Sequence, residues 1–277
     1  MTSRLSVLQS CTSRDVVLEP FPHIVVKNAL PLDLVEELVS QYPDLGILGV
    51  DKSIDNKRWS TPARAVSDNS QISKLWKEMI EYHSSEAFFL ELVSIFGDAI
   101  LSKLDGIWSS RSELENLRVG IRQQTPSDRA DVFLDAQIAG NTPALTPGVP
   151  RGIHFDSRNA LYAGLFYLRD PDDNSIGGDL QIWKWKSGYS NRKKASEYRE
   201  GVDVNHCELI GTIPYAANTL VLLINSIDSL HSVTTRQPTP HTRKFMNLLA
   251  DFNHDLFEFK PLLHRRIIPA LKRRLRS

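Results

Sequence analysis

Cysteine is nearly absent from this chain, which contains only Cys11 and Cys207. Two thiols so far apart in sequence argue against a disulfide scaffold and fit a reducing compartment, with room for one bridge at most. The segment Met1–Pro20 has charged side chains and no continuous apolar run, so we expect no secretory signal. No stretch approaches the roughly 20 apolar residues that span a bilayer. These absences predict a cytoplasmic protein without a transmembrane segment.

An excess of charge of either sign is also missing. The 33 Lys and Arg residues balance the 33 Asp and Glu residues, so the overall charge predicts neither nucleic-acid binding nor an acidic target. The exception is the basic C-terminal tail from His264 to Arg276, which could touch an anionic partner such as a lipid or a nucleotide-linked substrate. The plainer interpretation of this tail is a solvated helix end.

Helical spacing dominates the first ~115 residues, with uncertain element ends. Pro31 opens a helix that ends near Tyr42-Pro43, because Leu34, Val35, Leu38 and Val39 recur at helical spacing. The pattern predicts these further elements: a strand over 20–27, a loop over 51–70, a helical region over 72–96 and a shorter helical segment over 98–104. We interpret this region as a helical layer that supports a β core.

From Leu117 onward the period changes to that of strands. Turn-forming residues separate the apolar segments, and no long helix intervenes, which favours an antiparallel barrel or jelly roll. The expected strands cover 117–123, 131–138, 160–168, 179–186, 219–225 and 243–252, with loops over 140–150 and 187–204. The predicted organisation is one structural domain with an N-terminal strand and helical support region (1–115), a β core (116–255) and the basic tail (256–277).

The chemistry is concentrated in His154, Asp156 and the distant His231. Side chains at i and i+2 of a strand point to the same face, so His154 and Asp156 can converge on one ion. A histidine from another strand would complete a set of two imidazoles and one carboxylate. This set leaves coordination positions open and is typical of non-haem Fe(II) sites that activate O₂.

A tripeptide of this kind also occurs without a metal. In that interpretation His154 and Asp156 are surface residues where a loop meets a strand, and His231 caps a turn. Against it stand the buried-strand patterns beside the three residues, ALYAGLFYL over 160–168 and TLVLLIN over 219–225. We therefore favour a metal site.

In these segments the chain resembles the Fe(II)- and 2-oxoglutarate-dependent oxygenase superfamily, in its prolyl-hydroxylase-like branch. The matching segments are FPHIVVKNALPLDLVEEL, HFDSRNALYAGLFYLRD, GGDLQIW and HSVTTRQPTPHTRKFMNLL, which lie between residues 20 and 252. The resemblance implies an α+β protein with a double-stranded β-helix (jelly-roll) core. It also implies Fe(II), 2-oxoglutarate as co-substrate, O₂, and His154, Asp156 and His231 as both the metal ligands and the catalytic residues. Ascorbate is a candidate reductant.

The resemblance further implies a basic side chain that pairs with the far carboxylate of 2-oxoglutarate, on a strand after the distal histidine. Arg243 is the first choice, because a guanidinium holds a carboxylate by two parallel hydrogen bonds. Lys244 is the alternative but points to the other face of the strand, and Arg236 lies earlier in a Pro-rich loop. Asn247 shares the face of Arg243 and could add a hydrogen bond. Tyr167 is either a co-substrate contact or a core tyrosine.

The function implied is hydroxylation of a substrate with release of succinate and CO₂. Asp156 favours this outcome, because related halogenases lack the carboxylate; desaturation and cyclisation stay open. Asp135 and Gln137 could position substrate or face solvent on an edge strand. Two alternatives to the function are a cupin-type iron dioxygenase without 2-oxoglutarate and a catalytically silent barrel that serves as a binding module. The substrate, a small molecule, a glycan or a protein side chain, depends on loops that the sequence does not specify.

Overall fold

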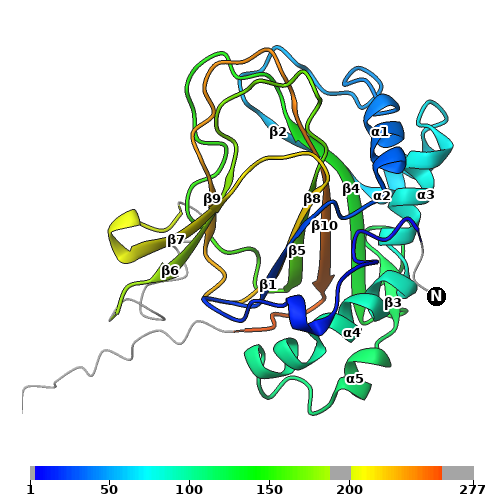
Figure 1. Ribbon diagram of the computed structural model, residues 1–277. Coiled ribbons are helices and arrows are strands. Elements are labelled where there is room, and N and C mark those ends of the chain that lie inside the picture. The colour runs from blue at the N-terminus through cyan, green and yellow to red at the C-terminus, as the bar shows by residue number, and fades with distance from the viewer. Residues whose placement is uncertain (1–3, 188–200, 258–277) are drawn as a thin grey trace, which may run out of the picture.

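The protein is a mixed α+β fold in which a small sheet packs against one face of a large one (Figure 1). The computed structural model describes residues 4–187 and 201–257. The large sheet has the strand order β1 (His23–Lys27), β8 (Thr219–Ile224), β5 (Ala160–Tyr167), β10 (Arg243–Phe252), β4 (Val132–Asn141) and β2 (Arg58–Thr61), with β3 (Val119–Ile121) beside β4. The small sheet has the order β7 (Cys207–Ile213), β6 (Leu180–Trp185) and β9 (His231–Val233). Apart from the parallel pair β3–β4, the strand pairs are antiparallel.

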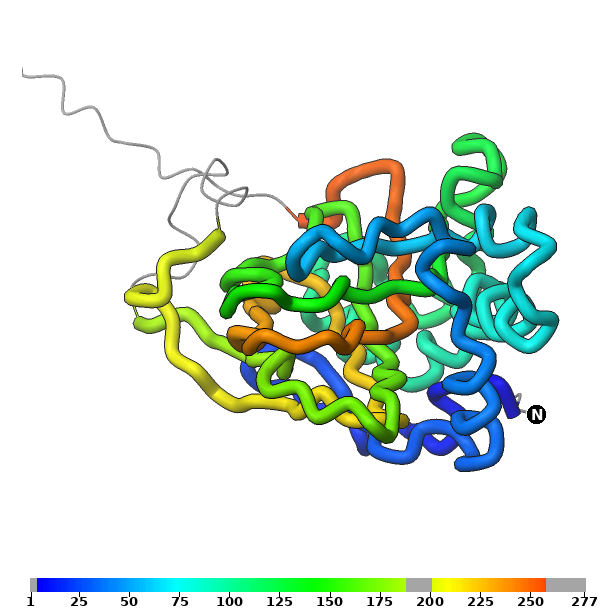
Figure 2. Tube along the Cα trace, turned by 90° about the horizontal axis from the view of Figure 1, so that it is seen from above, coloured from blue at the N-terminus to red at the C-terminus, as the bar shows by residue number. Residues whose placement is uncertain are grey.

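The helices gather on the face of the large sheet that lies away from the small sheet, as Figures 1 and 2 show. They are α1 (Leu32–Ser40), α2 (Ala63–Asp68), α3 (Lys74–His83), α4 (Glu86–Lys103) and α5 (Arg111–Glu115). Serine residues cap the two long helices: the hydroxyl of Ser73 accepts from the amide of Trp76, and that of Ser85 accepts from the amide of Phe88. Apolar side chains of α3 and α4 share one core with the large sheet.

The alternation of β4 gives its two faces different chemistry. Its even-numbered residues Val132, Leu134, Ala136 and Ile138 belong to the core beneath the helices. Side chains at odd positions point the other way, toward the small sheet, because successive residues of a strand face opposite sides. The polar residues of β4 therefore lie on the face toward the small sheet, because they would be unfavourable on the face that the helices cover. The same alternation on β10 places Met246 and Leu248 under the helices.

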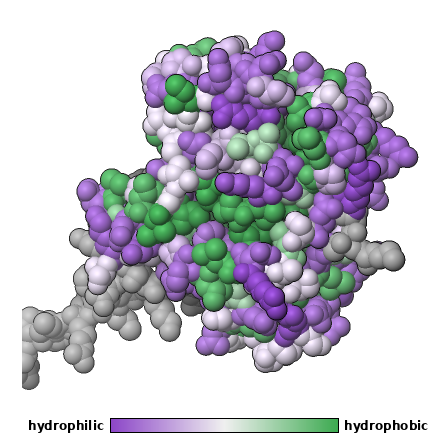
Figure 3. All heavy atoms as spheres, in the orientation of Figure 1, coloured by the Kyte–Doolittle hydropathy of each residue, from purple (hydrophilic) through white to green (hydrophobic). Residues whose placement is uncertain are grey.

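Strands β5 and β8 are apolar along their whole length because both of their faces are covered. Leu220 and Leu222 of β8 lie in the core under the helices, whereas Val221 packs with Leu180 of the small sheet. Every residue of β8 is buried. On the face seen in Figure 3, apolar side chains form a band across the middle of the molecule, between the small sheet and the main body.

One expectation for the N-terminal half was wrong, and two were correct as helix but differ in their bounds. The stretch 51–70 was expected to be a loop, but it contains β2 and α2, because Trp59 is buried and a short strand of this length gives little periodic signal. The helical region 72–96 is divided between α3 and α4 at Ser84 and Ser85, where the second cap forms. The shorter segment over 98–104 belongs to α4, which continues to Lys103. In the second half of the chain, the strand β7 and the short strand β9 were not predicted.

Strands β1 and β2 join the large sheet, so residues on both sides of the predicted division at 115 share one sheet. The division itself stays a prediction. Residues 258–277 of the basic tail and 188–200 of the loop over 187–204 lie outside the described residues. Among the helices of the described ranges, none combines the length and the apolar character that a membrane crossing requires.

Candidate metal centre

His154 and His231 face each other across an antiparallel bridge. The amide of His154 donates to the carbonyl oxygen of His231 at 3.0 Å, and the amide of His231 donates back to that of His154 at 2.9 Å. On its other side, His231 pairs with Ile182 of β6. Because the two backbones are held together in this way, the imidazole rings start from adjacent positions, and their centroids lie 4.2 Å apart.

The second nitrogen of each ring fixes its orientation. Nδ1 of His154 lies 2.8 Å from the carbonyl oxygen of Gly152, and Nδ1 of His231 lies 2.9 Å from that of Ser229. A carbonyl can only accept, so Nδ1 carries the proton in both neutral rings and Nε2 keeps its lone pair. This arrangement is common for histidines that bind a metal.

Asp156 completes the cluster. Its Oδ1 lies 3.7 Å from Nε2 of His154, and its Oδ2 lies 3.8 Å from Nε2 of His231. One donor atom from each residue falls within 4.8 Å of the other two. Metal–ligand bonds of about 2.1 Å hold two donors at most about 4.2 Å apart, so the separations from Asp156 suit a shared ion. The three residues predicted from the sequence therefore converge.

The electrostatics of the cluster favour neutral imidazoles and an ionised carboxylate. Burial and the neighbouring ring of His231 lower the pKa of His154 well below its ordinary value. Burial raises the pKa of Asp156, but both imidazoles and the guanidinium groups of Arg151 and Arg58 more than offset this, so the pKa lies below its ordinary value. Asp156 is enclosed by protein yet reaches solvent through a cavity, with 26% of its side chain exposed. Deprotonated ligands are the form that binds a metal.

Two connected cavities lie beside the cluster. The smaller, of about 70 Å³, is mostly apolar and lies between the sheets; its walls include Leu165, Leu180, Val221, Leu223 and Val233. The larger, of about 290 Å³, is mostly polar; its walls include Arg58, Arg122, Arg151, Gln137, Asn247 and Asp251. Asp156, Arg58, Arg151, Ala163 and Asn247 line both. We call them the apolar cavity and the polar cavity.

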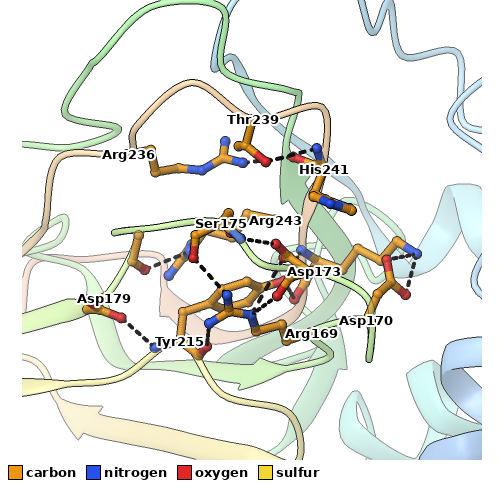
Figure 4. A network of polar contacts seen from close by, with 12 residues as sticks. Arg169, Asp170, Asp173, Ser175, Asp179, Tyr215, Arg236, Thr239, His241 and Arg243 are labelled. Atoms are coloured by element: carbon orange, nitrogen blue, oxygen red, sulfur yellow. Dashed lines mark hydrogen bonds and ion pairs between the residues drawn. The ribbon is translucent and has the colours of Figure 1, made fainter.

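Arg243, the first residue of β10, is buried without an acidic partner. Its Nε donates to the carbonyl oxygen of Gly178 at 2.8 Å, and its Nη2 donates to the hydroxyl of Tyr167 at 3.2 Å. The guanidinium carbon lies about 5 Å from the ring centroids of Tyr167, Tyr215 and Phe245. Among the described residues no carboxylate lies within 4.0 Å of it, although a buried cation is costly without a counter-charge. Figure 4 shows Arg243 inside this polar network.

Lys244 points to the opposite face of β10. Its Nζ lies 2.7 Å from Oδ2 of Asp170 and 4.9 Å from the ring centroid of Tyr42. Arg236, expected in a loop, is also buried and donates to Asn56 and to the carbonyl oxygens of Thr142 and His241. These hydrogen bonds link the segments that contain Asn56, Thr142 and His241, and they use N–H groups of the Arg236 guanidinium.

Asn247 contacts other protein side chains. Its Nδ2 donates to Oε1 of Gln137 at 2.9 Å, and its Oδ1 accepts from Nη2 of Arg58 at 3.2 Å. Asp135 accepts from Gln137 at 2.6 Å and from the amide of Ala63 at 2.8 Å. Asp135 and Gln137 are buried on a central strand, so the alternative of a solvent-facing edge strand is wrong.

Arg58 and Arg151 were not among the site residues predicted from the sequence. Arg58 lies in the stretch expected to be a loop, and its place depends on the pairing of β2 with β4. Arg151 lies three residues before His154, and Arg58 and Arg151 line both cavities. The order of polar Arg58, apolar Trp59 and polar Ser60 was the one available signal of a strand.

The comparisons with known proteins found distant structural matches and no match by sequence. No family model and no curated protein matches the chain. A prolyl-4-hydroxylase from Pseudomonas putida matches over 84% of this chain and 93% of its own, at 12% identity and a TM-score of 0.46. The alpha ketoglutarate dependent epimerase SnoN from nogalamycin biosynthesis matches over 83% and 78%, at 10% identity and a TM-score of 0.44. HygX from Streptomyces hygroscopicus, solved with nickel and 2-oxoglutarate bound, matches over 83% and 82%, at 10% identity and a TM-score of 0.41.

The likeness is distant. The matched structures include a prolyl-4-hydroxylase and alpha ketoglutarate dependent enzymes. TM-scores and identities this low do not establish an activity, so the function of this chain has to be inferred from its own side chains.

Proposed function

We propose that this protein is an Fe(II)- and 2-oxoglutarate-dependent dioxygenase that hydroxylates a substrate with release of succinate and CO₂. The observation that carries the proposal is the convergence of His154, Asp156 and His231, whose donor atoms lie within 4.8 Å of one another. We further propose that the two sheets form a double-stranded β-helix and that α1–α5 are its supporting layer.

The donor set fits iron in particular. Two imidazole nitrogens and one carboxylate, grouped on one side, leave the remaining positions of an octahedral ion for other ligands. With its side chain 26% exposed, Asp156 borders on open cavity space, so those positions are accessible. When bound, iron and 2-oxoglutarate supply the reduction of O₂ and the oxidising power for attack on a C–H bond.

The role of the protein is then to hold and orient these groups. The carbonyl oxygens of Gly152 and Ser229 keep Nε2 of both histidines deprotonated and directed toward Asp156. Asp156 contributes the negative charge that offsets the ion. Apolar walls of Leu165, Val221 and Leu223 limit the access of water to the cluster.

Arg243 is the proposed anchor for the far carboxylate of 2-oxoglutarate. It is a buried cation that has no acidic partner in the described part of the chain, and Gly178 and Tyr167 fix its guanidinium in place. Lys244, the alternative, is already paired with Asp170 on the other face of the strand. The hydroxyl of Tyr167 accepts a hydrogen bond from Arg243 and so helps to hold this anchor. Asn247 hydrogen-bonds to Arg58 and Gln137, so its role is to position these side chains in the polar cavity.

Succinate formation tests the proposal. Purified protein supplied with Fe(II), ascorbate and 2-oxoglutarate should release succinate, slowly even without its substrate, and Asp156→Ala should abolish this release. Arg129→Gln, which removes an exposed arginine, is the control and should retain it.

The alternatives give different results in the same assay. Oxygen uptake that does not depend on 2-oxoglutarate would indicate a cupin-type dioxygenase. The absence of both succinate release and oxygen uptake would indicate a binding module. Succinate release that persists in Asp156→Ala would count against the ligand assignment.

A further inference from the structure

The polar cavity contains more positive than negative charge. Its three arginines are Arg58, Arg122 and Arg151, and its carboxylates are Asp156 and Asp251. Arg122 is paired, because its Nε lies 2.9 Å from Oδ2 of Asp251. Arg58 and Arg151 have no carboxylate within 4.0 Å among the residues that the structure describes. Asp156 lines the same cavity, but the proposed function assigns it to the metal.

Arg58 is held in position by neutral groups. Its Nη2 donates to Oδ1 of Asn247 at 3.2 Å, and its guanidinium carbon lies 5.1 Å from the ring centroid of Phe245. Gln137 fixes Asn247 from the other side. Burial and the nearby charge of Arg243 lower the pKa of Arg58 to about 10, so the group stays cationic near neutral pH. The fold thus holds a cation in the wall of the cavity without pairing it with a carboxylate among the described residues.

The remaining walls of the polar cavity are suited to a small organic molecule. Leu249, Ala160 and Ala163 provide apolar surface beside the arginines. The hydroxyl of Tyr162, another wall residue, is buried and has no hydrogen-bond partner in the described ranges. The volume of about 290 Å³ equals that of about ten water molecules in the liquid. This space admits a small metabolite more readily than a glycan chain.

We propose that the polar cavity binds a small substrate that carries an anionic group, a carboxylate or a phosphate, and that Arg58 and Arg151 are the residues that hold this group. The inference rests on the proposed function, because it assigns Asp156 to the metal and the cavity to the substrate. Among the substrate classes that the sequence left open, it selects a small anionic molecule. Charge-assisted hydrogen bonds from two guanidinium groups would position the substrate beside the three proposed ligands.

Arg243, the proposed anchor of the co-substrate, lies outside the lining of the polar cavity. The polar cavity is lined by Asn247, Leu249 and Asp251 of β10, whereas Arg243 is the first residue of that strand and does not line it. Arg243 contacts Gly178 and Tyr167, and neither of these residues lines the polar cavity. We therefore assign the far carboxylate of 2-oxoglutarate to Arg243 and the anionic group of the substrate to Arg58 with Arg151; Arg58 and Arg243 both lie about 5 Å from the ring centroid of Phe245.

Calorimetric titration of non-turnover protein tests this assignment. Protein loaded with Mn²⁺ and one equivalent of 2-oxoglutarate would be titrated with 3-methylbutanoate, its neutral amide, and inorganic phosphate. We expect at least one of the anions to bind and the amide to bind at least about tenfold more weakly. Binding of the carboxylate alone or of phosphate alone would identify the anionic group, and either result supports the proposal.

Variants locate the bound anion. Arg58→Gln and Arg151→Gln should each weaken anion binding by at least about tenfold, whereas Arg58→Lys, which keeps the charge, should lose less. Arg129→Gln removes the same charge from the surface and should bind the anion like the wild type. Melting temperatures of the variants show whether a loss reflects unfolding.

Different negative results would overturn the assignment of the anion site and the proposed dioxygenase function. Detectable binding of the acid and its amide with equal affinity, or no binding of either anion up to about 10 mM, overturns the inference. Loss of 2-oxoglutarate binding in Arg58→Gln with its retention in Arg243→Gln also overturns it, because Arg58 would then be the co-substrate anchor of a working dioxygenase. If 2-oxoglutarate fails to bind to the wild type and the anion still binds through Arg58 and Arg151, the proposed function fails and the anion site stands.

Discussion

The guanidinium of Arg243 and the hydroxyl of Tyr167, on the neighbouring strands β10 and β5, are joined by a hydrogen bond of 3.2 Å. The bond leaves other N–H groups of Arg243 available, because a guanidinium has five donors. Tyr167 thereby restricts the orientation of a cation that has no carboxylate partner among the described residues. This pair is the basis of the first prediction.

Arg243→Gln should raise the KM for 2-oxoglutarate by at least about tenfold, because two hydrogen bonds to a charged group are lost. Tyr167→Phe should raise it by only a few fold, because the guanidinium remains. Initial rates of succinate formation at varied 2-oxoglutarate check both values. An unchanged KM in Arg243→Gln would remove Arg243 from the co-substrate site.

Gly178→Ala should weaken 2-oxoglutarate binding, although it changes neither Arg243 nor any of the proposed metal ligands. A Cβ at this position would lie 3.1 Å from Cδ and 3.2 Å from Nε of Arg243, and the backbone φ of +83° disfavours any side chain. Gly106 is the matched control: it also has a φ of +83°, but no atom lies within 4 Å of the added Cβ. Both variants should lose about 1 kcal/mol of stability.

The KM for 2-oxoglutarate separates the two glycine variants. It should rise in Gly178→Ala and stay at the wild-type value in Gly106→Ala. Equal KM values in the two variants would show that the position of Arg243 does not depend on Gly178.

Removal of metal should lower the melting temperature, because an ion that binds the folded state alone stabilises it. Protein treated with a chelator should regain the higher melting temperature when Mn²⁺ or Fe(II) is added back, and His231→Ala should show no such recovery. Scanning calorimetry with and without metal makes the comparison. A recovery of the same size in His231→Ala would place the ion elsewhere.

His83 should make the stability of the fold depend on pH. Its ring is fully buried, Nε2 accepts from the amide of Val7 at 3.2 Å, and Nδ1 lies 2.7 Å from the carbonyl oxygen of Met79. Burial lowers the pKa of His83 from 6.5 to about 4. Because the folded pKa lies below the unfolded one, the contribution is fully present above the unfolded pKa and is lost as the pH falls toward the folded pKa.

The free energy of unfolding of the wild type should therefore fall relative to that of His83→Gln by about 2 kcal/mol between about pH 7 and about pH 4.5. Urea titrations of the two proteins at each pH give this difference. A difference that is independent of pH would mean that His83 titrates alike in the folded and unfolded chains.

Much of the β core could be predicted from the sequence because its strands carry strong local patterns. The bounds expected for β10, Arg243 to Phe252, agree with those observed, since an apolar series from Met246 to Phe252 alternates with positions that include Asn247 and Asp251. β5 and β8 were recognised as buried strands, because an apolar run of this length between turn residues has few other structures. β2 and β9 were missed, because three or four residues are too few for a period to emerge.

The sequence by itself determined which donor atoms this protein has for a metal, because the spacing of His154 and Asp156 places both on one side of an extended chain. Only the tertiary structure decided that His231 lies opposite His154, through two backbone hydrogen bonds between distant segments. It also decided that Arg58 reaches the same cavity, through the register of β2 on β4. Such placements depend on the pairing of the whole sheet, which the local pattern of a short segment does not encode.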